Sequence, residues 1–128
     1  MSDLSNSLGI ASSGMQAQSA RLRLVAENMA NTDTPGYRRK TASFEQMYDG
    51  VQGAVKQSRV ELDRTDLPQV FDPSHPMADE SGYVRMSNVS LAVEIADARE
   101  AQRSYEANIS IFDQARRMYG GVLDLLRR

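Results

Sequence analysis

Apolar residues at the start of the chain recur at alternating intervals of four and three positions. This spacing places them on one narrow stripe of an α-helix that we expect over residues 5–31. The stripe consists of Leu4, Leu8, Ala11, Met15, Gln18, Leu22, Val25 and Met29. Glycine and serine are frequent, and Asp3 is the only charged residue before Arg21. Such a helix buries too little apolar surface to offset its own ordering, so we expect residues 1–25 to be disordered in an isolated monomer.

A second stripe with the same alternation lies near the other end and predicts a helix over residues 89–126. It consists of Ala98, Ala101, Tyr105, Asn108, Phe112, Ala115, Tyr119, Val122 and Leu126. Asn88 or Ser90 is a suitable N-cap, and Glu94 places negative charge near the positive end of the helix dipole. Gly120-Gly121 either ends this helix or lies within a continuous one, and the pattern does not decide between the two.

The middle of the chain has scattered apolar residues and is punctuated by glycine and proline, which favours short strands and turns. The expected strands are 37–47, 54–62, 69–71 and 82–86. The first two would pair across a turn at Asp49-Gly50. Residues 72–76 are expected to form a polar loop with two prolines, and the stretch 78–81, with its two acidic residues, is expected to be exposed.

These patterns predict a fold that is mainly α with a small β-rich insert. We expect an N-terminal helix in residues 1–33, the insert in 34–88 and a C-terminal helix in 89–128. Because both helices carry an apolar stripe, they should pair as a coiled-coil-like hairpin and form one helical core. Gln18 and Asn108 are polar members of the stripes, and such residues can fix the register of the pair at some cost in stability.

An abrupt stop separates the first helix from the insert. Pro35 cannot continue a helix, and the sequence 34–37, Thr-Pro-Gly-Tyr, suits a type II turn with proline second and glycine third. Asn28 and Asn31 place two side-chain amides just before this break. The stretch 26–37 therefore indicates a structural joint rather than a catalytic site.

Composition and charge make several function classes improbable. The chain has 128 residues, a net charge of −2 and no cysteine, so it has no disulfide, no thiolate chemistry and no overall attraction to nucleic acid. The basic run 38–40 lacks an aromatic platform; we expect a solvated strand start or contacts with acidic residues of a partner. His75 is the single histidine, so we expect no metal site, no cofactor and no catalysis. We also expect no membrane insertion and no cleaved signal peptide.

Two motifs at opposite ends of the chain carry a family resemblance. Leu22-x-x-x-Ala26-x-Asn28-x-Ala30-Asn31-x-x-Thr34-Pro35-Gly36-Tyr37 resembles the N-terminal signature of the bacterial flagellar axial proteins of the rod, hook and hook junction. Ala101-Gln102-Arg103-x-Tyr105-Glu106-Ala107-Asn108 resembles their C-terminal signature. Within the insert, Asp72-Pro73-Ser74-His75-Pro76, Gly82-Tyr83-Val84 and Asn88-Val89 are similar to the short subunits of the proximal rod.

The resemblance implies a structural, non-enzymatic subunit of the proximal rod, the drive shaft of the flagellar basal body, assembling helically through its terminal helices. Its implied partners are other proximal and distal rod subunits, the adaptor between the rod base and the MS ring, and the flagellar type III export apparatus. Such subunits are made in the cytoplasm, leave it without signal cleavage and reach the rod, which crosses the periplasm. The alternatives are a sibling proximal rod protein and a soluble coiled-coil adaptor or export chaperone.

The residues expected to carry packing and assembly come from the two stripes and the two motifs. They are Leu8, Met15, Leu22, Val25, Asn28, Met29, Asn31, Thr34, Pro35, Gly36, Tyr37, Ala101, Arg103, Tyr105, Asn108, Phe112, Ala115 and Tyr119. The aromatic members of the second stripe are expected to be packing knobs. For the two amides the alternatives are local capping of the first helix and hydrogen bonding to a neighbouring subunit, and for Asn28 we favour the neighbour.

Overall fold

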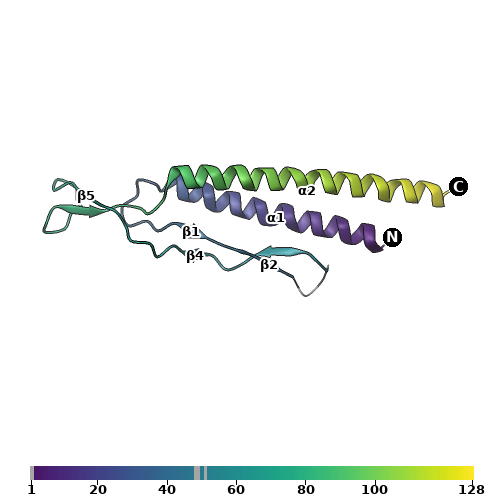
Figure 1. The fold of residues 1–128 in the computed structure, drawn as a ribbon, viewed down its shortest axis with the longest axis horizontal. Helices are drawn as coiled ribbons and strands as arrows, with labels where there is room; N and C mark the ends of the chain where they lie inside the picture. The colour runs from purple at the N-terminus through teal and green to yellow at the C-terminus, as the bar shows by residue number, and fades with distance from the viewer. Residues whose placement is uncertain (1, 48–49, 51) are drawn as a thin grey trace.

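The computed structural model describes residues 2–47, 50 and 52–128, and it contains two long helices with short strands between them (Figure 1). The elements of the described residues are α1 (Ser2–Ala30), β1 (Lys40–Thr41), β2 (Phe44–Gln46), β3 (Val55–Gln57), β4 (Glu61–Leu62), β5 (Gln69–Phe71), β6 (Tyr83–Arg85) and α2 (Leu91–Leu126). This arrangement confirms the predicted class, mainly helical with a small β insert. Neither helix is long and apolar enough over its described residues to cross a membrane.

The helices α1 and α2 run antiparallel, side by side, as the predicted hairpin (Figure 1). Their contact is lined by small buried residues, which allow the two backbones to approach closely: Ala11, Gly14, Ala17, Ala101 and Ala115. A Cβ atom added to Gly14 would lie only 2.7 Å from Nδ2 of Asn108. The helix-weakening glycine is therefore the residue that accommodates the Asn108 amide of α2.

Both stripes were predicted nearly correctly, with an error at one end of each. Met29 is 38% exposed, because the contact face of α1 passes through its neighbour Asn28 instead. Leu126 is 73% exposed at the end of α2. The helix continues through Gly120-Gly121 to Leu126, so the continuous alternative is the one observed.

The insert contains three two-stranded antiparallel ladders, β1–β4, β2–β3 and β5–β6. The predicted pairing of 37–47 with 54–62 is confirmed, but each of these segments is divided into two short strands. The strands predicted at 69–71 and 82–86 are also present, and they pair with each other. Ser43 and Ser58 lie at this division: the Ser43 amide donates to Oγ of Ser58 at 2.9 Å, so a side chain replaces a ladder carbonyl. Asp49, part of the predicted turn, lies outside the described residues.

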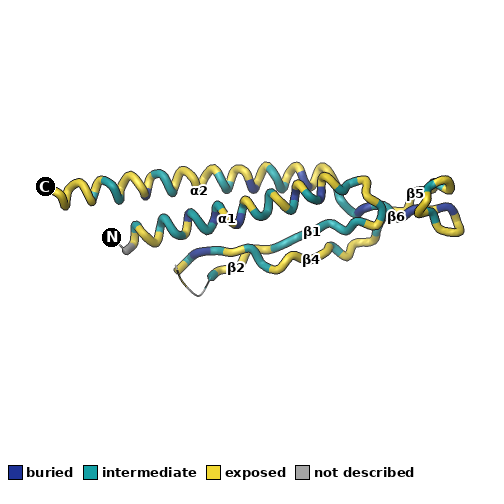
Figure 2. Tube along the Cα trace, turned by 180° about the vertical axis from the view of Figure 1, so that it is seen from behind, coloured by how far each residue is buried: buried dark blue, intermediate teal, exposed yellow. Residues whose placement is uncertain are grey.

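The insert has two arms, one ending in the β2–β3 ladder and the other in the β5–β6 hairpin, and they extend in opposite directions (Figure 1). The β2–β3 arm lies along α1, where the Val55 amide donates to Oγ of Ser13 at 3.0 Å and Ala54 is buried. The β5–β6 hairpin projects beyond the end of the helix pair. Burial is concentrated between the helices and along α1, whereas the outer side of α2 and most of the insert are exposed (Figure 2).

Candidate functional site

The joint between α1 and the insert is fixed by the side chain of Asn28, which is 1% exposed. Its Nδ2 donates to the carbonyl oxygen of Lys40 at 2.9 Å, and its Oδ1 accepts from the Lys40 amide at 2.9 Å. The carboxamide thus pairs with one residue of β1 as the peptide group of a neighbouring strand would. The Tyr37 hydroxyl donates to the same Oδ1 at 2.9 Å. Every hydrogen bond described for the Asn28 side chain therefore lies within the chain.

This geometry corrects our expectation that Asn28 bonds to a neighbouring subunit. The amide is buried and engaged by Tyr37 and Lys40 of its own chain, so it has no surface for a partner. Asn31 follows the local alternative: its Nδ2 donates to the carbonyl of Glu27 at 2.9 Å and its Oδ1 accepts from the Thr34 hydroxyl at 3.0 Å. Both amides therefore shape the joint.

The turn after α1 has the geometry that its sequence predicts. Gly36 has φ of 77°, and the Tyr37 amide donates to the Thr34 carbonyl at 3.2 Å, as in a type II turn with Pro35 second. The Gly36 amide also donates to the carbonyl of Arg85 at 3.0 Å. The turn is thereby attached to β6 at the base of the projecting hairpin.

Burial and the Glu27 charge raise the pKa of Tyr37, and the charge of Glu94 adds to this while that of Lys40 opposes it. The hydroxyl therefore keeps its proton, and its hydrogen bond to Asn28, to a pH above the usual range for tyrosine.

A second asparagine, Asn88, fixes the junction before α2. Its Oδ1 accepts from the Arg39 amide at 2.6 Å, and its Nδ2 donates to the carbonyls of Asp63 at 3.0 Å and Thr65 at 3.2 Å. The N-cap position is Ser90, whose side chain makes no capping bond. The sequence indicates Asn88 as a helix cap and as part of the family motif, and nothing near it in the sequence indicates this bridging role.

The basic run 38–40 is neutralised largely within the chain, by acidic residues of both helices. Arg39 forms an ion pair with Glu94, which is 0% exposed, and its Nη2 lies 2.7 Å from Oδ2 of Asp97. Lys40 Nζ lies 2.5 Å from Oε1 of Glu27. For Arg39 and Lys40, the expectations of a solvated strand start and of a partner's acidic residues are therefore both wrong.

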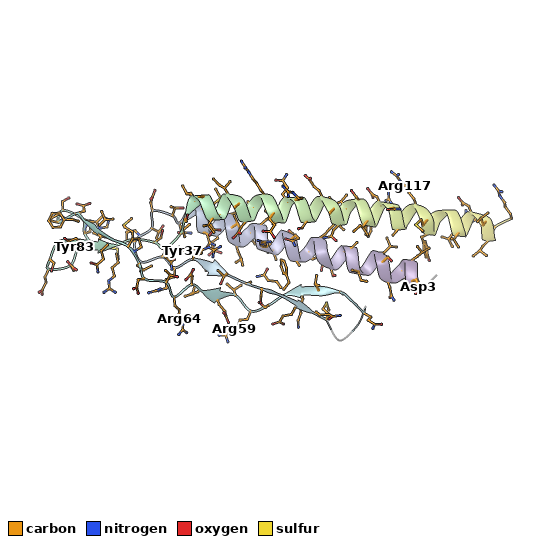
Figure 3. The ribbon with its side chains drawn as sticks, in the orientation of Figure 1. Asp3, Tyr37, Arg59, Arg64, Tyr83 and Arg117 are labelled. Atoms are coloured by element: carbon orange, nitrogen blue, oxygen red, sulfur yellow. The ribbon has the colours of Figure 1, made fainter. Side chains whose placement is uncertain are left out.

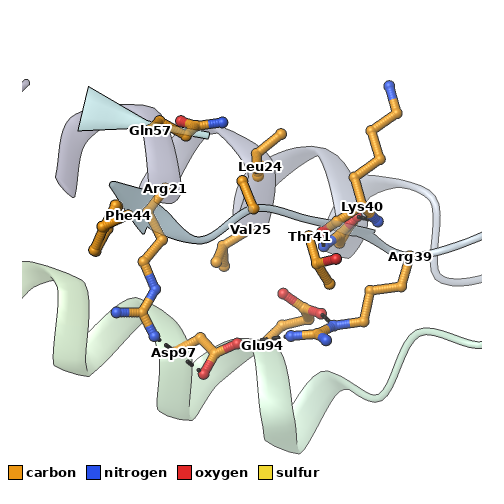
Figure 4. Close-up of a pocket in the computed structure, with 12 residues that line it drawn as sticks. Arg21, Leu24, Val25, Arg39, Lys40, Thr41, Phe44, Gln57, Glu94 and Asp97 are labelled. Atoms are coloured by element: carbon orange, nitrogen blue, oxygen red, sulfur yellow. Dashed lines mark hydrogen bonds and ion pairs between the residues drawn. The ribbon is translucent and has the colours of Figure 1, made fainter. Parts of the chain in front are cut away.

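The Arg39–Glu94 pair extends into a charged network between α1, β1 and α2 (Figure 4). Arg21 Nη2 lies 3.4 Å from Oδ1 of Asp97 and 3.4 Å from Oε2 of Glu100. Burial lowers the pKa of Arg39, but the hydrogen bond and charge of Glu94 and the charge of Asp97 outweigh this and leave it raised. Asp97 links the two arginines, and Glu94, expected only to complement the helix dipole, is the buried carboxylate at one end of this network.

The remaining residues expected to carry assembly divide between the helix contact and the surface. Leu8, Met15, Leu22, Tyr105, Phe112 and Tyr119 are half-buried, Val25 and Ala115 are buried, and Arg103 is exposed. Tyr105 lies beside Met15 in a shallow depression between the helices, in line with a packing role. The Asn108 amide donates to the Ser104 carbonyl of its own helix at 3.0 Å, so this bond does not link it to Gln18.

The described residues contain no cluster of three or more histidine, cysteine, aspartate or glutamate side chains suited to a metal ion. Nδ1 of His75 accepts the amide of Met77 at 3.0 Å, which gives this histidine a role in its own loop. The candidate site is therefore a structural joint, in which hydrogen bonds and ion pairs attach both helices to the start of the first strand of the insert.

Comparison with known proteins agrees with this architecture. Residues 8–38 match a family described as flagella basal body rod protein, and residues 80–125 match one described as flagellar basal body rod FlgEFG protein C-terminal. The chain is 45% identical to flagellar basal-body rod protein FlgC of Agrobacterium fabrum, over 99% of this chain and 98% of the relative. It is 36% identical to FlgC of Salmonella typhimurium, over 95% and 97% of the two chains, and 33% identical to that of Aquifex aeolicus, over 93% and 94%.

These relatives favour FlgC over the sibling rod protein FlgB. With matches at both helices and near full-length identity, the chain belongs to the FlgC family of flagellar basal-body rod proteins and is a structural, non-enzymatic subunit of the rod.

Proposed function

We propose that the chain is a proximal-rod subunit that assembles helically through a core of residues 1–33 and 89–128, with the insert 34–88 outside it. The observation that carries this proposal is the surface of α2, which is apolar on both flanks of its contact with α1. Spacings close to whole helical turns place Leu91, Ile95 and Ile109 on one flank and Val93, Ile111 and Met118 on the other. A helix with exposed apolar flanks is typical of one that is buried in an assembly.

The proposal is tested by placing a charge on one flank. Ile111→Asp should prevent incorporation into the rod, because a carboxylate would be buried without a partner between subunits. Ser110→Asp is the matched control, since Ser110 is the adjacent exposed residue and points away from α1. The readout is the amount of chain in purified basal bodies relative to the amount exported. Equal incorporation of both variants would contradict assembly through this flank.

We also propose that the chain passes unfolded through the flagellar type III export apparatus without cleavage. It would then meet proximal and distal rod subunits and the adaptor at the rod base. The sparsely charged α1, with its glycines, supports this order of events. Amide exchange of residues 2–25 in dilute monomer should be fast, and slow exchange there would contradict ordering on assembly. Basal bodies should contain the chain with its N-terminus intact, and a strain lacking the export apparatus should retain it in the cytoplasm.

A further inference from the structure

The projecting β5–β6 hairpin carries apolar side chains that nothing in the described chain covers. Phe71 and Tyr83 form an exposed cross-strand aromatic pair, with ring centroids 5.3 Å apart in an edge-to-face arrangement. Phe71 is 61% exposed and Met77 is 64% exposed. Side chains of this size are seldom left in water together unless they contact a partner.

Three carboxylates lie in the loop that joins the two strands of this aromatic pair. Asp72, Asp79 and Glu80 lie in the loop between β5 and β6, and none forms an ion pair among the residues that the structure describes. Asp72 accepts the hydroxyl of Ser74 at 2.8 Å, Asp79 accepts the amide of Tyr83 at 2.9 Å, and Glu80 has no hydrogen bond among the described side chains. We call the three carboxylates with Phe71, Met77 and Tyr83 the hairpin surface. It is aromatic, acidic and exposed.

A groove with the opposite charge lies along β4, in a different part of the insert. It is lined by Arg38, Arg59, Val60, Glu61, Leu62 and Arg64, and we call it the arginine groove. Within the described part of the chain, its three guanidinium groups form no ion pair with a carboxylate. Among the described residues, the side chain of Arg38 donates to the carbonyls of Asp63 and Thr65. Arg59 and Arg64 project away from the helices, whereas Tyr83 lies at the far end of the molecule (Figure 3).

We propose that the hairpin surface of one subunit docks into the arginine groove of a second copy of this chain. Three unpaired carboxylates then face three guanidinium groups, and the exposed Val60 and Leu62 receive the aromatic pair. Arginine suits both partners, because its planar group binds carboxylates in bidentate fashion and stacks on aromatic faces. Apart from Arg85 on β6, the charges of the hairpin surface are negative, and apart from Glu61, those of the arginine groove are positive. Each surface therefore finds its opposite charges on the other surface.

Because the two surfaces are different parts of the same chain, the contact is head-to-tail. Each subunit offers one hairpin surface and one arginine groove, so the contact repeats from copy to copy without closing unless the rotation completes a ring. This contact rests on the proposed helical assembly and adds to it a second interface, outside the helical core. The docking also gives a role to residues 72–76 and to the residues that follow them, none of which belongs to the joint.

Disulfide cross-linking in basal bodies tests the contact directly, since the chain has no native cysteine. Ser81→Cys in the hairpin turn with Val60→Cys in the groove should give covalent dimers and higher multimers of this chain on oxidation. Each single-cysteine variant, and Ser81→Cys combined with Arg117→Cys on α2, should not. Absence of the unsubstituted chain from basal bodies would refute the proposed function itself. Its presence without cross-links, or cross-linked to a different protein, would overturn only the docking.

Charge exchange gives an independent readout that does not depend on cysteine geometry. Glu80→Arg and Arg59→Glu should each reduce swimming-ring diameter to about half, because each places like charges across the contact, and the double variant should recover most of it. Asp33→Arg is the matched control, an exposed aspartate that belongs to neither surface. Single variants that swim as well as the control, or a double variant worse than either single one, would overturn the proposal.

Discussion

The clearest consequence of the joint is the effect of Asn28→Ala. The change removes three hydrogen bonds from a buried amide. Each such bond contributes about 1 kcal/mol net, and a buried group left unpaired costs about 1–3 kcal/mol. Water recovers part of this at Tyr37 and Lys40, which are only half-buried, and alanine returns up to about 0.5 kcal/mol as the better helix former. We expect the joint to lose about 2–3 kcal/mol.

Amide hydrogen exchange of Lys40 measures this loss locally, because its N–H donates to Oδ1 of Asn28. A change of 2–3 kcal/mol corresponds to a drop of about 30- to 150-fold in protection of that amide. Asn28→Asp should lose almost as much: it keeps the acceptors but directs a carboxylate oxygen at the Lys40 carbonyl. Asn31→Ala is the matched control, because it removes only local bonds, to the Glu27 carbonyl in α1 and to the Thr34 hydroxyl, and none to β1. It should change Lys40 protection by less than about fivefold.

Unchanged Lys40 protection in Asn28→Ala, or an equal loss of protection in Asn31→Ala, would contradict this role of the buried amide. Either result would mean that the turn, rather than the buried amide, holds β1 against α1. A full-strength joint in Asn28→Asp would show that the donated bond to the carbonyl of Lys40 contributes nothing.

Three further predictions follow from the same contacts. Gly14→Ala should not stabilise the helix pair, because its Cβ would lie 2.7 Å from Nδ2 of Asn108. The Cβ of Gly120→Ala would meet nothing within 4 Å, so this variant should gain up to about 1 kcal/mol of stability, measured by thermal unfolding. Glu94→Ala should destabilise the chain by about 2–4 kcal/mol in denaturant unfolding, because it leaves the partly buried Arg39 with one acidic partner fewer. An effect below that of a surface substitution would refute a stabilising role for this buried ion pair. Because the pKa of Tyr37 is raised, the stability that its protonated hydroxyl contributes is complete below pH 10. This stability declines as pH rises from that ordinary value through the folded-state value. Above pH 10, the unfolding midpoint of Tyr37→Phe should therefore fall less steeply than that of the unsubstituted chain.

The sequence was a good guide wherever structure is local. Heptad-like spacing predicts both helices and nearly all of their contact, and Pro35 with Gly36 predicts the turn. The strand segments were also placed correctly. The division of the first ladder was not, because it depends on Ser43 and Ser58 facing each other across strands, which alternation alone does not reveal.

The candidate site was harder to predict because its contacts are long-range. Arg39 and Glu94 are 55 positions apart, and nothing near either residue in the sequence signals that they meet. We expected Asn28 to bind a neighbouring subunit because it lies a full helical turn before the break. Its actual partner, Lys40, is 12 positions away on β1, and nothing in the sequence near Asn28 indicates that the chain returns to it there.

The two asparagines together give the joint a property that neither has alone. Asn88 accepts the amide of Arg39, while Asn28 binds both the amide and the carbonyl of Lys40, so consecutive residues of the insert are attached to the two helix junctions. Arg39 and Lys40 then bind acidic residues of α2 and α1 with their side chains. A displacement of either helix must therefore move the start of β1 with it. Because these amides are used internally, they are not available to other subunits. We therefore propose the apolar flanks of α2 and the charged surfaces of the insert as the surfaces that recognise them.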